Sequence, residues 1–299
     1  MVLGKIAADL HLAVTRRVAG GAPGIAAGTP VARGAGWSVE DVVCTSGPAD
    51  RPFEEQHSAV SIGIVVAGSF QYRSAAGREL MTPGSMLLGN PGQCFECGHD
   101  HASGDRCIAF HYAPEFFAQI AADAGATRPD RLFQVTRLPP SRELAALVAR
   151  ASEGVSVATE VSWEELAIQL ASRAIQLGME RRPTQADPPS GAVARVTRSV
   201  REIERQPAEP FGLRHLASEA GLSPFHYLRT FLHLTGVTPH QFVLRTRLRE
   251  AAARLAGEDT KIIEIALGSG FGDVSNFNRS FRTEFGVTPR GYRANAGRR

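Results

Sequence analysis

The chain has 299 residues, of which 43% are hydrophobic and 21% are charged, and its formal net charge is +3. This apolar fraction excludes a wholly disordered chain, and no run of about 18 or more apolar residues is present that would cross a bilayer. Four cysteines are too few for a secreted disulfide scaffold, and Asp9, Arg16 and Arg17 interrupt the region where a signal peptide is apolar. We therefore expect a globular cytoplasmic protein, with two domains favoured over one.

The charge is unevenly distributed along the chain. Residues 190–299 contain 17 Lys and Arg against 10 Asp and Glu, whereas residues 1–189 contain 16 against 20. Lys261 is the only lysine of the basic segment. Arginine forms planar, forked contacts with phosphate and guanine, so the last third of the chain is the segment suited to nucleic acid.

The first two segments differ in pattern. Residues 1–36 are rich in Gly, Ala and Pro without a sustained period and are predicted to be a loosely ordered arm. Short apolar runs follow between Trp37 and Tyr112, separated by turn signals such as Pro83-Gly84 and Asn90-Pro91-Gly92. Short runs with frequent turns are typical of an antiparallel barrel or sandwich, and we expect a small β-barrel.

Helical periodicity replaces the strand pattern after the barrel. Helices are predicted over 141–150 and from residue 162 to about 177, and the second has an apolar stripe that packs either on the barrel or on a second subunit. The barrel is the commoner partner for such a stripe. The Pro-rich segment 183–191 is predicted to be a linker, so that a sensor domain occupies 37–182 and a separate domain occupies 192–299.

An internal repeat in the basic segment carries the most specific signal. Leu216-Ala217 and Ala220-Gly221-Leu222 recur 49 residues later as Ile265-Ala266 and Ser269-Gly270-Phe271. One residue is then inserted, so the offset becomes 50. At this offset Tyr227, Arg229 and Phe231 correspond to Phe277, Arg279 and Phe281, and the segment Gly236 to Pro239 corresponds to Gly286 to Pro289. Repetition of this kind predicts two copies of one structural unit.

Each copy has the features of a helix-turn-helix unit. A short helix ends at a glycine, Gly221 or Gly270, and a capping residue, Ser223 or Asp273, begins a second helix. The apolar side chains of the second helices share one face, so the other face points outward and can enter a major groove. The predicted base contacts are Phe225, Arg229, Val274, Ser275, Asn278 and Arg279, and the predicted backbone contacts are Ser223, Arg245 and Arg282. The joining helix, Pro239 to Ala256, is about 27 Å long, which suits two units in successive grooves.

These segments resemble the AraC/XylS family of bacterial transcription regulators. The resemblance is carried by Ala217 to Phe231, Arg247 to Leu255, Ile265 to Phe281 and Phe285 to Arg293, and it covers about residues 193–293. It implies an α+β multidomain protein with an N-terminal cupin-like β-barrel and helical hairpin and a C-terminal all-α tandem helix-turn-helix domain. It also implies base contact at the six residues named above. Leu232 stands where the family usually has a lysine or arginine. In the front domain, Pro83 to Leu88 is similar to cupin-type turns.

A cluster of cysteines and histidines suggests what the front domain senses. Cys94 and Cys97 are followed by His99 and His101, and the other candidate residues are His57, Glu96 and Cys107. These ligand types suit zinc or another thiophilic metal ion. Alternatives are an organic effector in a barrel that these residues only line, a thiol redox sensor, and buried cysteines that only pack.

The sequence therefore predicts a sequence-specific DNA-binding regulator with an N-terminal domain that senses a small effector or a metal ion. The expected partners are double-stranded promoter DNA, RNA polymerase for an activator, and a second copy in a homodimer. A cupin-type metalloenzyme is the alternative from another class, but the sequence has no evenly spaced His-x-His…Glu…His set, and catalysis would not explain the repeat. We expect no enzymatic activity.

Overall fold

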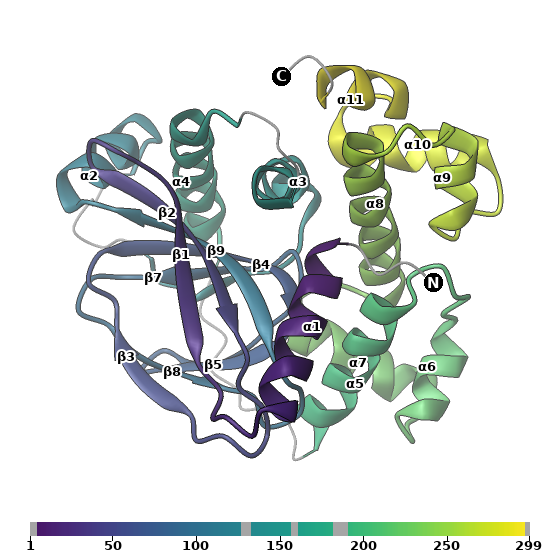
Figure 1. The fold of residues 1–299 in the computed structure, drawn as a ribbon, viewed down its shortest axis with the longest axis horizontal. Coiled ribbons are helices and arrows are strands. Elements are labelled where there is room, and N and C mark those ends of the chain that lie inside the picture. The colour runs from purple at the N-terminus through teal and green to yellow at the C-terminus, as the bar shows by residue number, and fades with distance from the viewer. Residues whose placement is uncertain (1–4, 127–132, 157–160, 182–190, 297–299) are drawn as a thin grey trace.

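The computed structural model describes residues 5–126, 133–156, 161–181 and 191–296. They form a β-rich N-terminal domain with helices beside it and an all-helical C-terminal domain (Figure 1). No helix in these ranges is both long and apolar enough to span a membrane. The linker predicted over 183–191 lies, apart from Gly191, outside the described residues.

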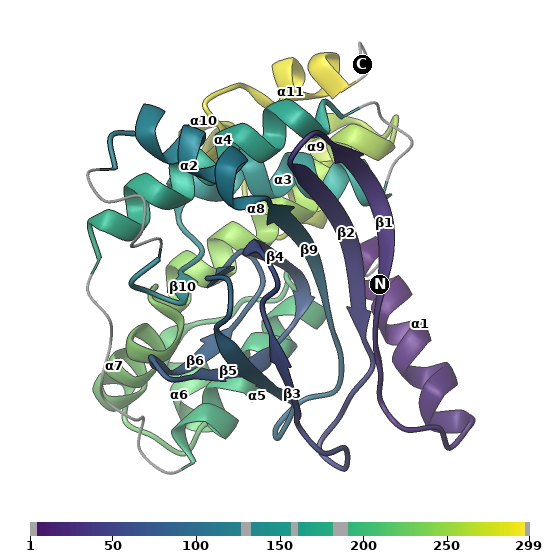
Figure 2. The ribbon, with the colours of Figure 1, turned by 90° about the vertical axis from the view of Figure 1, so that its left-hand side faces the viewer.

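The strands of the N-terminal domain form two antiparallel sheets. The larger has the order β1 (Ala26–Gly34), β2 (Trp37–Cys44), β9 (Asp105–Tyr112), β4 (Val60–Gly68), β7 (Met86–Gly89) and β10 (Arg137–Leu138). The smaller has the order β3 (Phe53–Gln56), β8 (Cys94–Gly98), β5 (Phe70–Ser74) and β6 (Gly77–Met81). Side chains from both sheets, including Val65, Tyr72 and Met81, form a core between them. The predicted cupin-like β-rich domain is thus confirmed, as two facing sheets (Figure 2).

Strand β9 is the centre of the larger sheet. It pairs along its whole length with β2 on one side and with β4 on the other. At one end of the strand, Asp105 is opposite Cys44 of β2 and Gly68 of β4. Residues directly opposite each other in an antiparallel pair have side chains on the same face of the sheet. The register therefore brings together residues that are far apart in the sequence.

Helices cover the outer face of the larger sheet. They are α2 (Pro114–Asp123), α3 (Arg142–Ser156) and α4 (Trp163–Met179), and their apolar side chains share one core with β2, β4, β7 and β9. The stripe predicted on the helix from residue 162 packs on this sheet, where Leu166, Leu170 and Ala174 are fully buried. The hydroxyl of Tyr112 also donates to the carbonyl of Ala167, at 2.9 Å. The interpretation that the stripe packs on the barrel is confirmed.

The loosely ordered arm predicted over residues 1–36 is wrong for the described residues from Lys5 onward. Helix α1 (Lys5–Ala19) packs against β4 and β9, and Leu10 is only 5% exposed. The next segment is β1, which pairs with β2 from Ala26 to Gly34. The Gly and Ala residues of β1 have little strand propensity of their own, so the hydrogen bonds to β2 decide the structure there.

The C-terminal domain begins with α5 (Ala192–Arg205) and contains both predicted units. The first unit is α6 (Leu213–Glu219) and α7 (Pro224–Thr235), α8 (Pro239–Gly257) joins the units, and the second unit is α9 (Ile262–Gly268) and α10 (Val274–Phe285), followed by α11 (Pro289–Ala296). Figure 1 shows α8 running between the two units. The turn glycines Gly221 and Gly270 have positive φ angles of 63° and 86°. Ser223 and Asp273 accept hydrogen bonds from backbone N–H groups three residues on, at 3.3 and 2.7 Å, as predicted for caps.

The burial of one face of α7 leads to a prediction for the free energy of unfolding. Phe231 is fully buried in the core of the first unit, whereas Phe225 on the same helix is 69% exposed. Phe231→Ala is expected to lower the free energy of unfolding by about 3 to 5 kcal/mol, because it removes buried apolar surface and leaves a cavity. Phe225→Ala is the matched control and is expected to change it by about 0.5 kcal/mol or less. Urea denaturation followed by helical circular dichroism measures both, and equal losses would contradict the burial of Phe231.

Candidate nucleic-acid interface and sensor cluster

The predicted base-contact residues lie on the outer faces of α7 and α10. Phe225, Arg229, Ser275, Asn278 and Arg279 are exposed, and Val274 is half-buried. The opposite faces of the helices hold Tyr227 and Phe231 or Phe277 and Phe281, all fully buried. The guanidinium of Arg229 lies over the ring of Phe225, 5.7 Å from its centroid. In both units, the residues predicted as base contacts therefore lie on the outward side of the second helix, and we call these six residues the recognition faces.

The three predicted backbone contacts differ in their surroundings. Arg282 is exposed in the last turn of α10, and Ser223 is exposed at the start of α7, where its hydroxyl caps the helix. Arg245 does not fit the prediction. Its Nε pairs with Glu284 at 3.1 Å, its Nη1 donates to the carbonyl of Pro140 at 2.8 Å, and its side chain is only 16% exposed. As the molecule stands, Arg245 joins α8 to α10 and to the N-terminal domain and does not face a duplex.

Other arginines of the joining helix also make internal contacts. Arg247 donates to the carbonyls of Pro207 and Glu209, at 2.7 and 2.8 Å, and so attaches α8 to the loop after α5. Arg254 pairs with Glu258 one turn later, at 3.2 Å. Burial lowers the pKa of Arg249 to about 10, although Glu204 and Glu284 oppose this shift. These positive charges on α8 therefore serve packing within the molecule.

Strand β8 separates the predicted metal ligands instead of gathering them. Successive side chains of a strand point to opposite faces. Cys94 is exposed and Glu96 pairs with Arg73 at 2.6 Å, whereas Cys97 lies against the core between the sheets. After the strand, His99 is buried and His101 is exposed. Neither the Cys-x2-Cys pair nor the His-x-His pair forms a joint site in this structure, because Cys94 and Cys97 lie on opposite faces of β8 and only one of the two histidines is buried.

His57 belongs to the interior between the sheets. Its Nε2 is 3.0 Å from the hydroxyl of Tyr72, and its ring stacks on Phe95 with centroids 4.3 Å apart. Burial, together with the nearby His111, lowers the pKa of His57 to about 4. His57 is therefore neutral at pH 7 and forms part of the wall of the core between the sheets.

The structure does gather two of the predicted residues into a different group. His99 and Cys107 lie beside Cys44 and Asp105, and we call these four residues the buried Cys/His/Asp cluster. His99 Nε2 is 2.6 Å from Asp105 Oδ1, and the Cys107 thiol donates to Asp105 Oδ2 at 3.3 Å. Burial lowers the pKa of His99, but hydrogen bonds with Asp105 and Cys44 outweigh it and raise this pKa to about 9.

Sequence reasoning missed Cys44 and Asp105. Cys44 lies 50 residues before Cys94 in the chain, and it enters the group only because β2 pairs with β9. Asp105 follows Ser103-Gly104, and such a Ser-Gly-Asp run has the composition of a turn. The alternation of Asp105 and Cys107 on β9 was the available clue, since residues two apart on a strand share a face.

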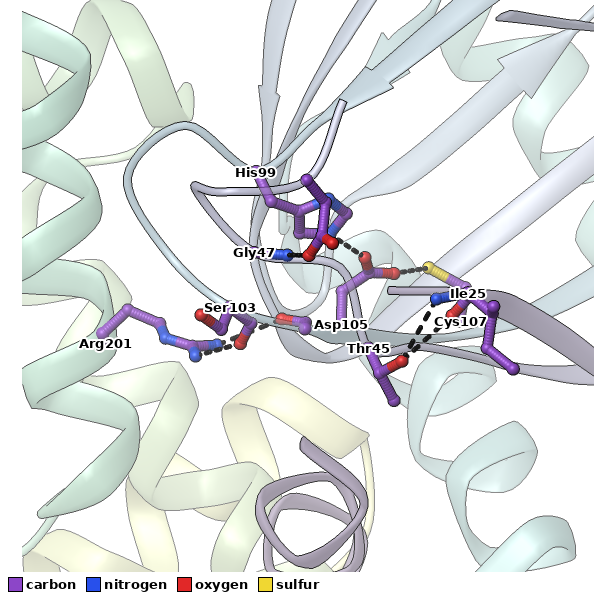
Figure 3. A network of polar contacts seen from close by, with 10 residues as sticks. Ile25, Thr45, Gly47, His99, Ser103, Asp105, Cys107 and Arg201 are labelled. Atoms are coloured by element: carbon purple, nitrogen blue, oxygen red, sulfur yellow. Dashed lines mark hydrogen bonds and ion pairs between the residues drawn. The ribbon is translucent and has the colours of Figure 1, made fainter. Parts of the chain in front are cut away.

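The first helix of the C-terminal domain attaches beside this cluster. Arg201 of α5 donates to the carbonyls of Ser103 and Gly104, the second at 3.3 Å, as Figure 3 shows. Glu204 Oε1 accepts from the N–H of Gly68 at 3.0 Å. Gly104 precedes Asp105 in the chain and Gly68 pairs with it in the sheet. Both polar contacts of α5 therefore reach the backbone next to the buried Cys/His/Asp cluster.

Further contacts hold the two domains together. Arg137 Nη1 donates to the carbonyl of Thr235 at the end of α7, at 2.9 Å. Ala145 and Ala149 of α3 share a core with α8 and α10, and Leu80 of β6 joins the core of the first unit. Tyr292 of α11 also contacts Glu153 of α3. The C-terminal domain is thus docked on the N-terminal domain through both of its helix-turn-helix units.

An open cavity of about 730 Å³ lies between α1 and α5 at this interface. One wall is apolar, with Leu10, Val14 and Ala67, and the other carries Arg198, Arg201 and Arg205. The cavity separates α5 from α1. On the side of α5 that faces α1, the hydrogen bonds of Arg201 and Glu204 therefore attach α5 to the N-terminal domain.

Two family models match the chain. A model described as an AraC-like ligand binding domain matches residues 44–174, and one described as a helix-turn-helix domain matches residues 216–295. The first corresponds to most of the two sheets and helices α2 to α4. The second begins in α6 and ends in α11, so it contains both recognition faces.

Curated relatives are transcription regulators. The chain is 35% identical over 94 residues to the probable transcription factor PqrA of Proteus vulgaris, with 31% of this chain and 77% of PqrA covered. It is 31% identical over 152 residues to the transcriptional activator RhaS of Salmonella agona, with 51% of this chain and 52% of RhaS covered. The chain thus spans about half the length of RhaS. Among solved structures, ToxT from Vibrio cholerae matches at 15% identity over 87% of this chain and 98% of ToxT, with a TM-score of 0.37.

The contact of Glu204 with Gly68 generates a prediction for pH dependence. Burial raises the pKa of Glu204 from 4.5 to about 7, although Arg201 and Arg249 oppose the shift, and Oε2 is buried without a hydrogen-bond partner among the described residues. The docked form therefore binds more protons than the unfolded form between about pH 4.5 and 7. The contribution of Glu204 to stability is most favourable below about pH 4.5 and is lost as the pH rises through 7.

Glu204→Gln removes this titration and keeps an oxygen that can accept from Gly68. We expect the variant to have a higher midpoint of thermal unfolding than the wild type at pH 8 and a flatter pH profile between 4.5 and 7. Differential scanning calorimetry at several pH values measures both. Glu219→Gln is the matched control because Glu219 is exposed on α6. A lower midpoint for Glu204→Gln at pH 8 would show that the carboxylate stabilises the docked form in its charged state.

Proposed function

Because the chain belongs to the AraC/XylS family of transcription regulators, we propose that it binds promoter DNA through both recognition faces and regulates transcription in response to a signal at its N-terminal domain. The observation that carries this proposal is the pair of equivalent outer faces on α7 and α10, in two units joined by α8. A structural corner has no need of an exposed arginine, Arg229 or Arg279, at the same position of two copies. The regulators among the relatives favour this function over the cupin-type metalloenzyme.

The recognition faces suit direct readout in the major groove. Arg229 and Arg279 are exposed at equivalent positions of the repeat, and arginine binds guanine through two hydrogen bonds. Ser275 and Asn278 supply further hydrogen-bonding groups, and Phe225 and Val274 supply apolar surface for thymine methyl groups. We propose these six residues as base contacts, with Ser223 and Arg282 at the phosphate backbone.

The two units differ in what they offer to a duplex. In the first unit, Leu228 and Leu232 lie on the groove side of α7, and Leu232 is 44% exposed. A leucine donates no hydrogen bond to base or phosphate, so Arg229 carries most of the polar readout of α7. In the second unit Ser275, Asn278 and Arg279 are all polar. We therefore propose that the second unit contributes more of the sequence specificity.

The docking of the domains supports a role for the N-terminal domain in control. β6 contacts the first unit, α3 contacts the second, and the loop 99–104 contacts α5, so a change in the N-terminal domain can alter how the two recognition faces are placed. A ligand shifts such an equilibrium only by its difference in affinity for the two arrangements. The partners we propose are a small effector or metal ion, a second copy of the chain, and RNA polymerase, since RhaS is named as an activator.

The test of this function begins with duplexes selected by the wild-type chain from a random-sequence library. Arg279→Ala is expected to weaken binding to the selected duplex by about 1 to 3 kcal/mol and to relax the preference at one base pair, because the lost contact reads a guanine edge. Fluorescence anisotropy with the selected duplex and its single-base variants measures both effects.

Arg33→Ala is the matched control, because Arg33 is an exposed arginine on β1, far from α7 and α10 in the fold. It is expected to leave the base preference unchanged. A loss for Arg279→Ala that is equal on all sequences would assign Arg279 to a phosphate. Failure of the wild-type chain to select any duplex would end the proposal that it reads DNA.

A further inference from the structure

The buried Cys/His/Asp cluster brings four metal-binding side chains together from distant parts of the chain. Cys44 ends β2, Asp105 begins β9 opposite it, His99 follows β8, and Cys107 is two residues beyond Asp105 on the same face of β9. One ligand atom from each of Cys44, His99 and Asp105 lies within 4.8 Å of the other two. Cys44, His99 and Asp105 are only 4 to 5% exposed. Cys107 joins this group through the hydrogen bond from its thiol to Asp105 Oδ2, at 3.3 Å.

The donor set selects one class of cation. Thiolate and imidazole ligands suit zinc and similar thiophilic ions, whereas Mg²⁺ and Ca²⁺ take oxygen ligands. A tetrahedral zinc ion with ligands at about 2.0 to 2.3 Å keeps the ligand atoms roughly 3.3 to 3.8 Å apart. The present 2.6 Å between His99 Nε2 and Asp105 Oδ1 must widen by less than about 1 Å, which a small side-chain rotation supplies.

We propose that Cys44, His99, Asp105 and Cys107 bind a thiophilic divalent cation such as Zn²⁺. This site differs from the one that the spacing of Cys94, Cys97, His99 and His101 predicts, because it uses only His99 of those four residues. The cation replaces the hydrogen bonds within the cluster by bonds to one central ion. Metal binding at the cluster does not depend on the proposed regulator function, whereas the role of the ion as a signal rests on it.

The surroundings of Asp105 connect this site to the DNA-binding domain. The residue before Asp105 is Gly104, whose carbonyl accepts from Arg201, and its strand partner Gly68 donates to Glu204 (Figure 3 shows the first contact). Gly68 and Gly104 both have positive φ angles, 75° and 73°, and a Cβ on Gly68 would lie 2.3 Å from the carbonyl oxygen of Gly104. Because the backbone is packed so closely here, a movement of Asp105 is expected to shift Gly104 and Gly68, and with them the contacts of Arg201 and Glu204. Metal binding is thus expected to change how α5 is held.

The first experiment measures binding by the full-length, reduced and metal-stripped chain. Titration with Co²⁺ is expected to produce visible d–d bands and a thiolate-to-cobalt charge-transfer band at one ion per chain, and Zn²⁺ is expected to displace the Co²⁺. Cys44→Ser and Cys107→Ser are each expected to weaken Co²⁺ binding tenfold or more. Cys94→Ser is the matched control and is expected to bind as the wild type does, since Cys94 is exposed on the other face of β8.

Circular dichroism checks that each variant is folded, and Cys44→Ala replaces Cys44→Ser if the serine variant is not. An absence of thiolate-to-cobalt charge transfer in the folded wild type would overturn the site and leave His99 and Asp105 as a buried ion pair. Loss of binding in Cys94→Ser with binding retained in Cys44→Ser would overturn the choice of ligands.

The second experiment measures coupling, with the duplexes selected by the wild-type chain as probes. Saturating Zn²⁺ is expected to change the affinity of the wild type for DNA by about fivefold or more. Arg201→Ala is expected to keep the Co²⁺ spectrum and to lose most of this Zn²⁺ effect. Equal affinities with and without Zn²⁺ would refute the coupling. Metal binding without any DNA binding would refute the proposed function and leave the metal site intact, so the two failures are distinguishable.

Discussion

The pairing of β9 on both of its edges is the constraint on which the rest of the structure depends. Because β2 and β4 pair with β9 along its full length, each residue of β9 has a fixed neighbour on either side. At one end this places Cys44, Asp105 and Gly68 in one row across the sheet, and at the other end Tyr112 reaches the backbone of α4. A slip of one residue would turn every side chain of β9 to the opposite face. The same pairing therefore buries Phe110 under the helices and Cys107 between the sheets.

Function in the C-terminal domain depends on a different division of side chains. Phenylalanines hold each unit together from inside, and in the second unit the ring of Phe281 contacts those of Phe277 and Phe285. On α8, Arg245, Arg247 and Arg254 contact carbonyls and carboxylates of the molecule itself, and Arg249 donates to the hydroxyl of Thr246. On α7 and α10, by contrast, Arg229, Arg279 and Arg282 are exposed. The basic balance of this segment overstates the charge available to DNA, because a part of it serves packing.

The sequence predicts the helix-turn-helix units closely because their signals are local. A glycine with positive φ, a capping residue and an apolar stripe lie within about a dozen residues of one another, and each acts on its own stretch of chain. The buried Cys/His/Asp cluster is different, because strand register joins Cys44 to Asp105 across 61 positions of sequence. Spacing favoured Cys94 with Cys97, and the alternation of β8 separates them. Arg245 was misplaced for a similar reason, since its partner Glu284 lies on another helix and Pro140 lies in another domain.

The interface between the two domains contains buried charged groups. Their energetics determine how easily the arrangement of the domains can change. Glu204 and Arg249 are both buried near the interface, where burial shifts the pKa of each toward its neutral form and the charge of each opposes the shift of the other. Desolvation of two charges offsets much of the attraction between them, so such a pair adds little net stability. The guanidinium–carbonyl contacts of Arg137, Arg201 and Arg245 are worth about 1.5 to 3 kcal/mol each at most. A difference of a few kcal/mol in ligand affinity is then comparable with one or two of these contacts, so a small ligand or ion can shift the balance between arrangements of the domains.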